Sequence, residues 1–578
     1  MAENILILSM TRMGDMIQTT PLIRGLKEKY PTAKITLLVT SDFSGVVPMI
    51  PDVDDSISLN IKQFDAKDQW DDLSWIKIFR YLENSLDVIK ERNFDLLVNL
   101  SHSKFSALMV RYLRIKNVVG FHCNDFGNRM TGHPWMQYFG VEVFNRNYNE
   151  FNLVEMFSRS GGVDVRGRTI EVVPSKNSVE KFIPSNIDEG VLIGFQAGSS
   201  LEGRRWSAQS FAKLANILIG KLNARIVIFG VESEREMADG IAQLVEDKER
   251  VFNVAGRTNL DELSGLLEKC EYLVTNDTGT MHLAAALGTK IVGLFFAHAH
   301  PYETAPFSPG HIIFQADISC APCSYGVHCN DIVCVDKVSP HHISAVIENH
   351  IVTRNWNLPS EITTESELKV FETIFDVNNN FKLRPLVRNI FKIEDLFRIS
   401  YGLLWRAQLD SLQGSGGNEM LVNGICQELL RDYDCSNLKA LDQPLNKKIS
   451  VLVDIRRIAV AGKSLCRDII RGVSSGNGNS KKMTQLIEKI IALDEKIEVQ
   501  GLSNPVIRPL MDMFNKRKEN QMGDNACLLA MDTQKVYERL ITECEQLELL
   551  LKACVQNISD FKTDYNSHSS INVTVPGR

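Results

Sequence analysis

The feature that most constrains this chain is an alternation of short apolar runs with helical patterns. It begins at residue 4 and begins again near residue 190. Residues 4–8 (NILIL) form a nearly continuous apolar run, as expected for a strand buried in a parallel sheet. A helical pattern follows over residues 16–29, and further strand patterns lie at 34–39, 94–100 and 117–120. Strands that alternate with helices predict an α/β layer around a parallel sheet.

The second series repeats this alternation. Its strand patterns lie at residues 191–195, 224–229, 271–275 and 290–295, and its helical patterns lie at 207–222, 261–269 and 281–287. Each series spans roughly 170 residues, which is an ordinary domain size. We therefore predict one α/β domain at residues 1–165 and another at 185–352. Two such domains usually hold a ligand between them, at the carboxyl ends of their strands.

The character of the chain changes beyond about residue 355, where we expect no further strands. Apolar residues recur at helical spacing over residues 384–412, 418–431, 482–500 and 533–558. Because helices without strands must bury their apolar stripes on each other, we predict a helical domain at residues 360–560. The apolar stripe within residues 536–551 is interpreted as core, with a partner or self-association helix as the alternative. The polar residues 565–578 are predicted to form a disordered tail.

Composition and charge exclude several classes of protein. Apolar residues make up 44% of the chain and charged residues 23%, which is typical of a globular protein and not of a disordered or fibrous one. The net charge of -7 disfavours general binding of nucleic acid, so we expect no nucleic-acid partner. No apolar stretch reaches the ~20 residues of a membrane-spanning helix, and residues 5–8 are too short for a signal-peptide core. We expect a cytoplasmic protein, with peripheral contact to the inner face of the membrane as a further option.

Three loops that follow predicted strands carry residues suited to an anionic ligand. In residues 13–15 (Met-Gly-Asp), Asp15 either caps a helix or acts as a general base. Residues 198–206 (GSSLEGRRW) combine hydroxyl side chains with two arginines, whose charge and fork suit a diphosphate; a solvated basic loop is the alternative. Residues 277–279 (Asp-Thr-Gly) precede a helix whose first backbone amides can bind phosphate.

Together these motifs resemble those of glycosyltransferase family 9, the heptosyltransferases, which extend lipopolysaccharide core or modify autotransporter proteins. The resemblance covers residues 3–352. It rests on residues 13–15, on Gly-Ser-Ser…Arg-x-Trp within 198–206, on 230–232 (Gly-Val-Glu) and on Asp-Thr-Gly-x-x-His at 277–282, in the family's order. It implies the GT-B fold, in which two Rossmann-like domains face a cleft, here followed by an α-helical C-terminal domain.

The resemblance also implies a role for each matched residue. Asp15 would be the general base that deprotonates the acceptor hydroxyl in a one-step, inverting reaction. The donor-binding residues would be Ser199, Ser200, Arg204, Glu232, Thr258, Asp277, Thr278, Gly279 and His282. Two positions depart from the family pattern, because Arg204 stands where Lys is usual and Gln196 stands where His is common.

The activity implied is transfer of a heptose from ADP-heptose to a lipopolysaccharide-core saccharide or to a protein hydroxyl. No cofactor would be required for this catalysis. Two alternatives stay open. The same fold and pocket can serve another nucleotide sugar, or the chain can be a scaffolding protein that works through its helical extension.

Four cysteines form a compact run within residues 320–334, with the pattern Cys320-x2-Cys323-x5-Cys329-x4-Cys334. Four thiolates at this spacing suit a tetrahedral structural metal, either Zn²⁺ or iron. Four reduced thiols in a loop are the alternative. The resemblance adds that the autotransporter-modifying branch of the family carries an iron-bound cysteine finger.

Overall fold

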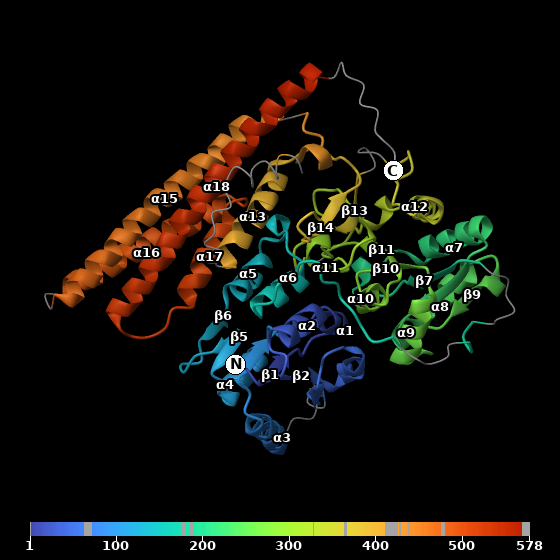
Figure 1. Ribbon diagram of the computed structural model, residues 1–578, viewed down its shortest axis with the longest axis horizontal. Helices are drawn as coiled ribbons and strands as arrows, with labels where there is room; N and C mark the ends of the chain where they lie inside the picture. Colours follow the sequence, from blue (N-terminus) through green and yellow to red (C-terminus); the bar gives the residue numbers. More distant parts are fainter. Residues whose placement is uncertain are drawn as a thin grey trace. The chain divides into compact units, whose positions relative to one another are not determined.

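The computed structural model describes residues 2–62, 72–174, 180–183, 190–199, 201–327, 329–362, 367–410, 426, 429–436, 438–475 and 480–568 (Figure 1). The chain divides into two compact units. The first, here called the α/β unit, consists of Met1–Met136 and Phe151–Val387. The second, the helical unit, consists of Gln137–Glu150 and Arg388–Arg578.

The first sheet of the α/β unit has six strands in the order β3-β2-β1-β4-β5-β6. Its strands are β1 (Asn4–Leu8), β2 (Lys34–Thr40), β3 (Asp55–Leu59), β4 (Leu96–Asn99), β5 (Asn117–Cys123) and β6 (Arg129–Gly132). Strands β1 to β5 are parallel, and β6 is antiparallel to β5. The helices that accompany the sheet are α1 (Met13–Ile17), α2 (Thr20–Lys29), α3 (Asp72–Glu91), α4 (Lys104–Leu113), α5 (Pro134–Glu142) and α6 (Leu153–Ser160). The strand order reverses beside β1, which is where α/β sheets open a crevice for ligands.

The second sheet has eight strands in the order β14-β13-β12-β11-β10-β7-β8-β9. Its parallel strands are β7 (Leu192–Gln196), β8 (Arg225–Phe229), β9 (Val251–Asn253), β10 (Tyr272–Asn276), β11 (Lys290–Phe295) and β12 (Ile312–Ala316). Its helices are α7 (Ala208–Leu222), α8 (Arg235–Leu244), α9 (Leu260–Lys269), α10 (Gly279–Ala286), α11 (Pro301–Thr304) and α12 (Pro340–Thr353). The order reverses between β7 and β10, so the loops after these two neighbouring strands meet at the sheet's crevice.

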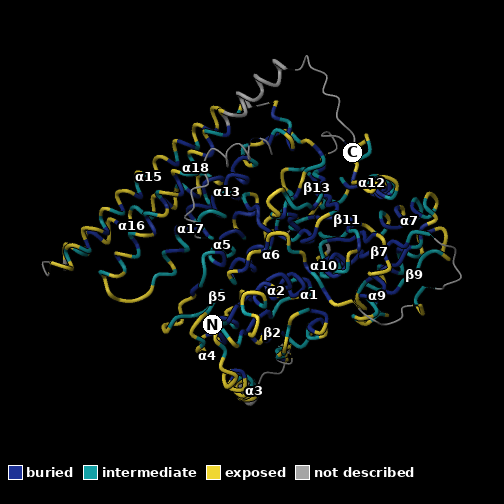
Figure 2. Tube along the Cα trace, in the orientation of Figure 1, coloured by how far each residue is buried: buried dark blue, intermediate teal, exposed yellow. Residues whose placement is uncertain are grey.

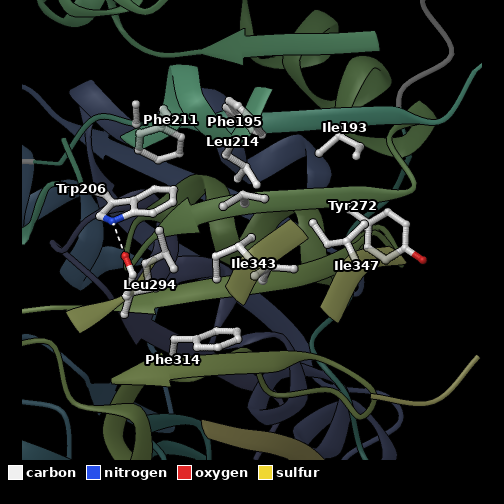
Figure 3. Packing of buried hydrophobic residues seen from close by; sticks show 14 of the residues in the cluster. Ile193, Phe195, Trp206, Phe211, Leu214, Tyr272, Leu294, Phe314, Ile343 and Ile347 are labelled. Carbon is white, nitrogen blue, oxygen red and sulfur yellow. Dashed lines mark hydrogen bonds between the residues drawn. The ribbon is translucent and has the colours of Figure 1, made fainter. Parts of the chain in front are cut away.

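The core of this second half packs α7 and α12 against the sheet (Figure 3). Phe195 of β7 and Phe211 of α7 are fully buried, with ring centroids 5.3 Å apart. Trp206, at the end of the loop after β7, is 2% exposed and packs on Phe211, and its Nε1 donates to the Val338 carbonyl oxygen at 3.1 Å. A buried aromatic of this size stabilises the fold by about 1.5–3 kcal/mol. It therefore fixes one end of the loop at residues 198–206.

Two antiparallel strands lie where we expected only helices. Strand β13 (Leu368–Phe375) pairs with β12, and β14 (Phe381–Pro385) pairs with β13. In β13, Leu368 and Val370 are buried in the core of the second sheet. The expectation that strands end near residue 355 is therefore wrong, because a hairpin extends the second α/β domain past residue 352. The helix predicted from residue 384 begins at Ile393.

The predicted boundary of the first domain also changes. Residues 137–150 lie inside the predicted domain 1–165 but belong to the helical unit. The reason is packing: Tyr138 lies against Trp405 with ring centroids 5.8 Å apart, and Glu150 accepts a hydrogen bond from Arg398 Nη1 at 3.0 Å. The segment that leaves the first sheet thus supplies part of the helical unit's core.

The helical unit is built from α13 (Ile393–Leu409), α15 (Leu438–Ser474), α16 (Ser480–Ser503), α17 (Arg508–Glu519) and α18 (Ala526–His568). Figure 1 shows α15, α16 and α18 as long helices side by side, and buried and exposed residues alternate along them in Figure 2. The stripe at residues 536–551 is core, as predicted, since Leu540, Leu547 and Leu551 are fully buried. Most of the helix predicted at 418–431 lies outside the described residues. So does the predicted tail from residue 569 on, whereas α18 reaches His568.

Within the described part of the chain, no helix is both long enough and apolar enough to cross a membrane.

Candidate functional site

The topology brings two of the predicted binding loops together. Residues 197–206 follow β7 and residues 277–278 follow β10, and these parallel strands are neighbours in the sheet. Asn276 joins the two loops, because its Nδ2 donates to the Ala197 carbonyl oxygen at 2.7 Å and its Oδ1 accepts from the Trp206 amide at 3.3 Å. Asn276 carries no signal in the sequence beyond its place at a strand end. It holds the two loops at one edge of the sheet.

The third predicted loop belongs to the first sheet and contacts the second at a pair of glycines. A Cβ on Gly14 would lie 3.0 Å from His282 Cδ2 and 3.1 Å from Gly279 Cα, and a Cβ on Gly279 would lie 3.2 Å from the Gly14 nitrogen. All three distances are shorter than ordinary contacts of a Cβ atom. Glycine at these two positions lets the start of α1 pack directly on the start of α10.

This packing brings Asp15 close to Asp277. The Arg12 amide donates to Asp15 Oδ2 at 3.2 Å, and the side chain of Asp15 is half-buried. Burial raises the pKa of Asp15 above its usual value, the nearby Arg12 opposes this, and the negative charge of Asp277 raises the pKa further. A carboxylate whose pKa is raised binds a proton more tightly, which is what a general base requires.

Arg204 and Asp277, two predicted donor-binding residues, form an ion pair with each other. Each side chain is 11% exposed, and Arg204 Nη2 also donates to the Asp277 carbonyl oxygen at 3.0 Å. Arg204 Nε is buried and has no hydrogen-bond partner in the described structure. The pair therefore fixes the guanidinium while its Nε–H stays uncommitted.

Ser199 contributes a second uncommitted group. It is 3% exposed, and among the described residues its hydroxyl has no partner. Its carbonyl oxygen accepts from Arg205 Nε at 2.9 Å and from Arg205 Nη2 at 2.6 Å, so Arg205 holds the loop. Ser200, also predicted to bind the donor, lies outside the described residues.

The start of α10 presents the predicted Thr278 and Gly279. Both are partly exposed, and Thr278 Oγ1 lies 3.4 Å from Thr275 Oγ1. The first amides of a helix have no partner within it, and the helix dipole makes this end attractive to an anion. This end of α10 is thus a suitable place for a phosphate group.

His282 is held by a residue that the sequence did not single out. Gln18 Nε2 lies 3.4 Å from the Gly14 carbonyl oxygen, to which it donates, and 3.3 Å from His282 Nε2. Both side chains are buried, and burial lowers the pKa of His282 to about 4, so the ring is neutral at pH 7. Because an amide nitrogen only donates, this network assigns the ring proton to Nδ1. That atom is buried, and no described residue accepts from it.

Glu232 and Thr258 lie away from this cluster. Glu232 follows β8, its side chain is 70% exposed, and it forms an ion pair with Arg235 at 2.5 Å. Thr258 lies between β9 and α9 and is partly exposed. Strands β8 and β9 are the second and third from β10, and neighbouring strands are ~4.8 Å apart. Both residues therefore border the same edge of the sheet, roughly 10–15 Å from Asp277.

Glu234 is a further residue that the sequence analysis missed. Its Oε2 accepts from the Val231 amide at 3.0 Å and from Gln196 Nε2 at 3.3 Å. A Cβ on Gly198 would lie 2.0 Å from its carboxylate. Gly198 is therefore required here by Glu234, and Gln196, which departs from the family pattern, helps the Val231 amide to hold that carboxylate.

The four cysteines share the segment between β12 and α12. Cys334 is buried, and its pKa is raised by this burial and by the neighbouring Cys320 and Cys329. Cys329 Sγ donates to the Asp331 carbonyl oxygen at 3.1 Å. Among the described residues, which exclude His328, no three His, Cys, Asp or Glu side chains are arranged to hold an ion. The metal at Cys320, Cys323, Cys329 and Cys334 therefore stays a prediction.

Comparisons with known proteins match the part of the chain that contains these loops. A family model, glycosyltransferase family 9 (heptosyltransferase), matches residues 86–333. Lipooligosaccharide heptosyltransferase 2 of Haemophilus influenzae is 26% identical over 322 residues, which are 53% of this chain and 86% of that protein. Lipopolysaccharide heptosyltransferase 2 of Escherichia coli K12 is 26% identical over 319 residues, which are 53% of this chain and 85% of that protein.

One solved structure shows the fold. The glycosyl transferase family 9 protein from Veillonella parvula superposes with a TM-score of 0.50 at 20% identity, covering 61% of this chain and 97% of that one. The two mainly parallel sheets are those of the GT-B fold, as predicted, and a helical region follows them.

Proposed function

Residues 86–333 form a domain of glycosyltransferase family 9, and from this premise we propose that the chain transfers a heptose from ADP-heptose to an acceptor hydroxyl. Glycosyl transfer follows from the family. The donor is proposed because the relatives named above are heptosyltransferases. The acceptor is proposed to be a lipopolysaccharide-core saccharide or a protein hydroxyl.

The single observation that carries the proposal is the contact between Gly14 and Gly279. It sets a carboxylate with a raised pKa, Asp15, beside the open end of α10. A base and an anion-binding helix end are the two parts that a one-step transfer from a diphosphate sugar requires. Here they come from different sheets and meet at one place.

The proposed transfer requires no reactant besides the sugar donor and the acceptor. Asp15 takes the proton of the acceptor hydroxyl as the acceptor oxygen forms a bond to the anomeric carbon. The bond between that carbon and the diphosphate oxygen breaks, and the electron pair leaves with ADP. Attack opposite the leaving group inverts the anomeric centre.

The leaving diphosphate gains negative charge, and the uncommitted donors around α10 are suited to stabilise it. They are the Ser199 hydroxyl, Arg204 Nε, the Nδ1–H of His282 and the first amides of α10. Buried donors fixed in advance cost no reorganisation when charge develops. Glu232 follows β8 and Thr258 follows β9, and we propose that the nucleoside of the donor lies beside them along this edge of the sheet.

Asp15→Asn tests the proposed base. The amide keeps the shape of the side chain but cannot take a proton, so transfer should fall by about 10²–10⁴-fold while ADP-heptose binding is retained. Asp125→Asn is the matched control, because the side chain of Asp125 is 83% exposed and lies in the same unit. Unchanged transfer in Asp15→Asn, or loss of donor binding with it, would exclude the role of base.

A further inference from the structure

The helical unit contains a pocket that the proposed transfer does not use. It has a volume of about 340 Å³ and is bordered by the end of α17, the segment after it and the first turns of α18. Arg517, Gln521, Lys535 and Arg539 line it, with Asp532 as the one acidic residue of the lining. All of these residues belong to the helical unit, whereas the transfer site lies in the α/β unit.

The positive charges of the pocket are only partly neutralised. Lys535 Nζ donates to Asp532 Oδ1 at 2.9 Å. Both Nη atoms of Arg517 donate to Glu543, at 2.9 and 2.6 Å, so both oxygens of that carboxylate are engaged. Arg539 makes no ion pair with any described residue. Its guanidinium is the charge that an incoming anion would neutralise.

Two buried N–H groups in the same lining lack acceptors. Arg517 is 7% exposed, and its Nε has no hydrogen-bond partner among the described residues; the same is true of Gln521 Nε2. Thr533 Oγ1 donates to Gln521 Oε1 at 3.0 Å, which orients the amide so that Nε2 remains a donor. A buried N–H without an acceptor is costly and rare in folded proteins. Two such groups lining one pocket are suited to an acceptor bound there.

The electrostatics of Arg539 agree with this. Partial burial and the nearby positive charge of Arg517 lower the pKa of Arg539 below its usual value, and Glu543 opposes the shift. Within the described structure Glu543 pairs with Arg517 alone, so the two neighbouring guanidiniums repel each other. An anion between them would remove that repulsion.

We propose that this pocket binds a phosphate group. The donors belong to four side chains from α17, the segment after it and α18, an arrangement that suits a tetrahedral anion with three or four acceptor oxygens. Arginine is the side chain best matched to phosphate, because its donors form a rigid fork and its charge does not titrate. The phosphate can be free, or it can belong to a small phosphorylated molecule that fits about 340 Å³.

Hydrogen exchange on the full-length protein measures phosphate binding at the residues that line the pocket. Sodium phosphate is titrated at constant ionic strength with sodium chloride, and peptides over residues 508–525 and 526–545 are followed by mass spectrometry. Slower exchange in both peptides is expected in the wild type. In Arg539→Gln the phosphate concentration for half-protection should rise at least ~10-fold. Arg539 is exposed, so its replacement should leave the fold intact.

Lys552→Gln is the matched control, because Lys552 is also an exposed cation of α18 and pairs with Glu548 outside the pocket. It should behave as the wild type does. No protection of these peptides in the wild type, or equal protection in Arg539→Gln, would overturn the proposal. A parallel titration with mannose 6-phosphate separates the sources. Protection at lower concentration than with phosphate identifies a phosphorylated saccharide, and equal concentrations identify the phosphate group alone.

Discussion

Replacing Gly14 by Ala should separate two elements that the proposed reaction needs in contact. The new methyl group would lie 3.0 Å from His282 Cδ2 and 3.1 Å from Gly279 Cα. The His282 ring is held by Gln18, and Gly279 Cα is backbone, so neither can move aside by rotating a side chain. The start of α1 must therefore shift by a few tenths of an ångström.

The cost of this substitution has two parts. Overpacking of this kind destabilises a fold by about 1–3 kcal/mol. A shift of the proposed base relative to the donor site should lower kcat by roughly 10-fold or more, since misplacement by ~1 Å costs about 100-fold. Donor affinity should change less than kcat, because Ser199 and Arg204 belong to the second sheet and keep their supports.

Steady-state transfer and thermal unfolding of Gly14→Ala, measured beside Gly220→Ala, check the reasoning. Gly220 lies in α7, and a Cβ added there would meet nothing within 4 Å. Alanine at Gly220 should stabilise the helix by about 0.5–1 kcal/mol and leave transfer unchanged. Wild-type kcat in Gly14→Ala would refute the argument that the contact between α1 and α10 assembles the site.

Three further predictions concern stability and positioning. Asp15→Asn should unfold at a higher temperature than the wild type at pH 7. A carboxyl whose pKa is raised by folding contributes stability only at low pH, and this stability is lost as the pH rises through the folded pKa. The difference in unfolding temperature between the two proteins should therefore vanish in acid. Gln18→Leu removes the hydrogen bond that keeps the ring proton of His282 on Nδ1, so the ¹⁵N NMR shifts of Nδ1 and Nε2 should change. The variant should also lower kcat more than it raises KM. Unchanged ¹⁵N shifts would exclude the positioning role of Gln18. Arg398→Ala should destabilise the helical unit by about 3–5 kcal/mol, because the side chain of Glu150, 3% exposed, stays buried after it loses this ion pair; unaltered unfolding of this variant would contradict this.

The fold could be predicted from the sequence because buried parallel strands leave continuous apolar runs. Residues 4–8 and 290–295 are examples, and each is a strand in the structure. The sequence did not predict the hairpin β13–β14, because its pattern is not specific to a strand. Leu368-Lys-Val-Phe-Glu-Thr-Ile-Phe375 follows a long helix and precedes others, and its apolar residues also fit a helical stripe. The segment is a strand because it pairs with β12, and the sequence does not reveal this pairing.

The sequence predicted which loops form the site, but it did not predict which of their side chains bind each other. The motifs around Asp15, Ser199 and Asp277 follow strand ends, so a common edge could be inferred. That Arg204 would bind Asp277, instead of each facing a ligand alone, depends on β7 and β10 being neighbours. Strand order is set by the whole sheet and leaves no local pattern. Gln18 likewise acquires its role only because α1 packs on α10.

Donor binding by Ser199→Ala is the most direct test of the central claim that the buried, uncommitted donors of the second sheet hold the diphosphate. The Ser199 hydroxyl has no partner among the described residues, so its removal costs the fold no hydrogen bond. Calorimetry with ADP-heptose, beside UDP- and GDP-sugars, should show selective binding of ADP-heptose that Ser199→Ala weakens about 10-fold, as expected for a hydrogen bond to a charged group. Ser264→Ala, which removes an equally buried and unpartnered hydroxyl of α9, should bind as the wild type does. Equal affinity in Ser199→Ala, or preference for another nucleotide sugar, would contradict the account.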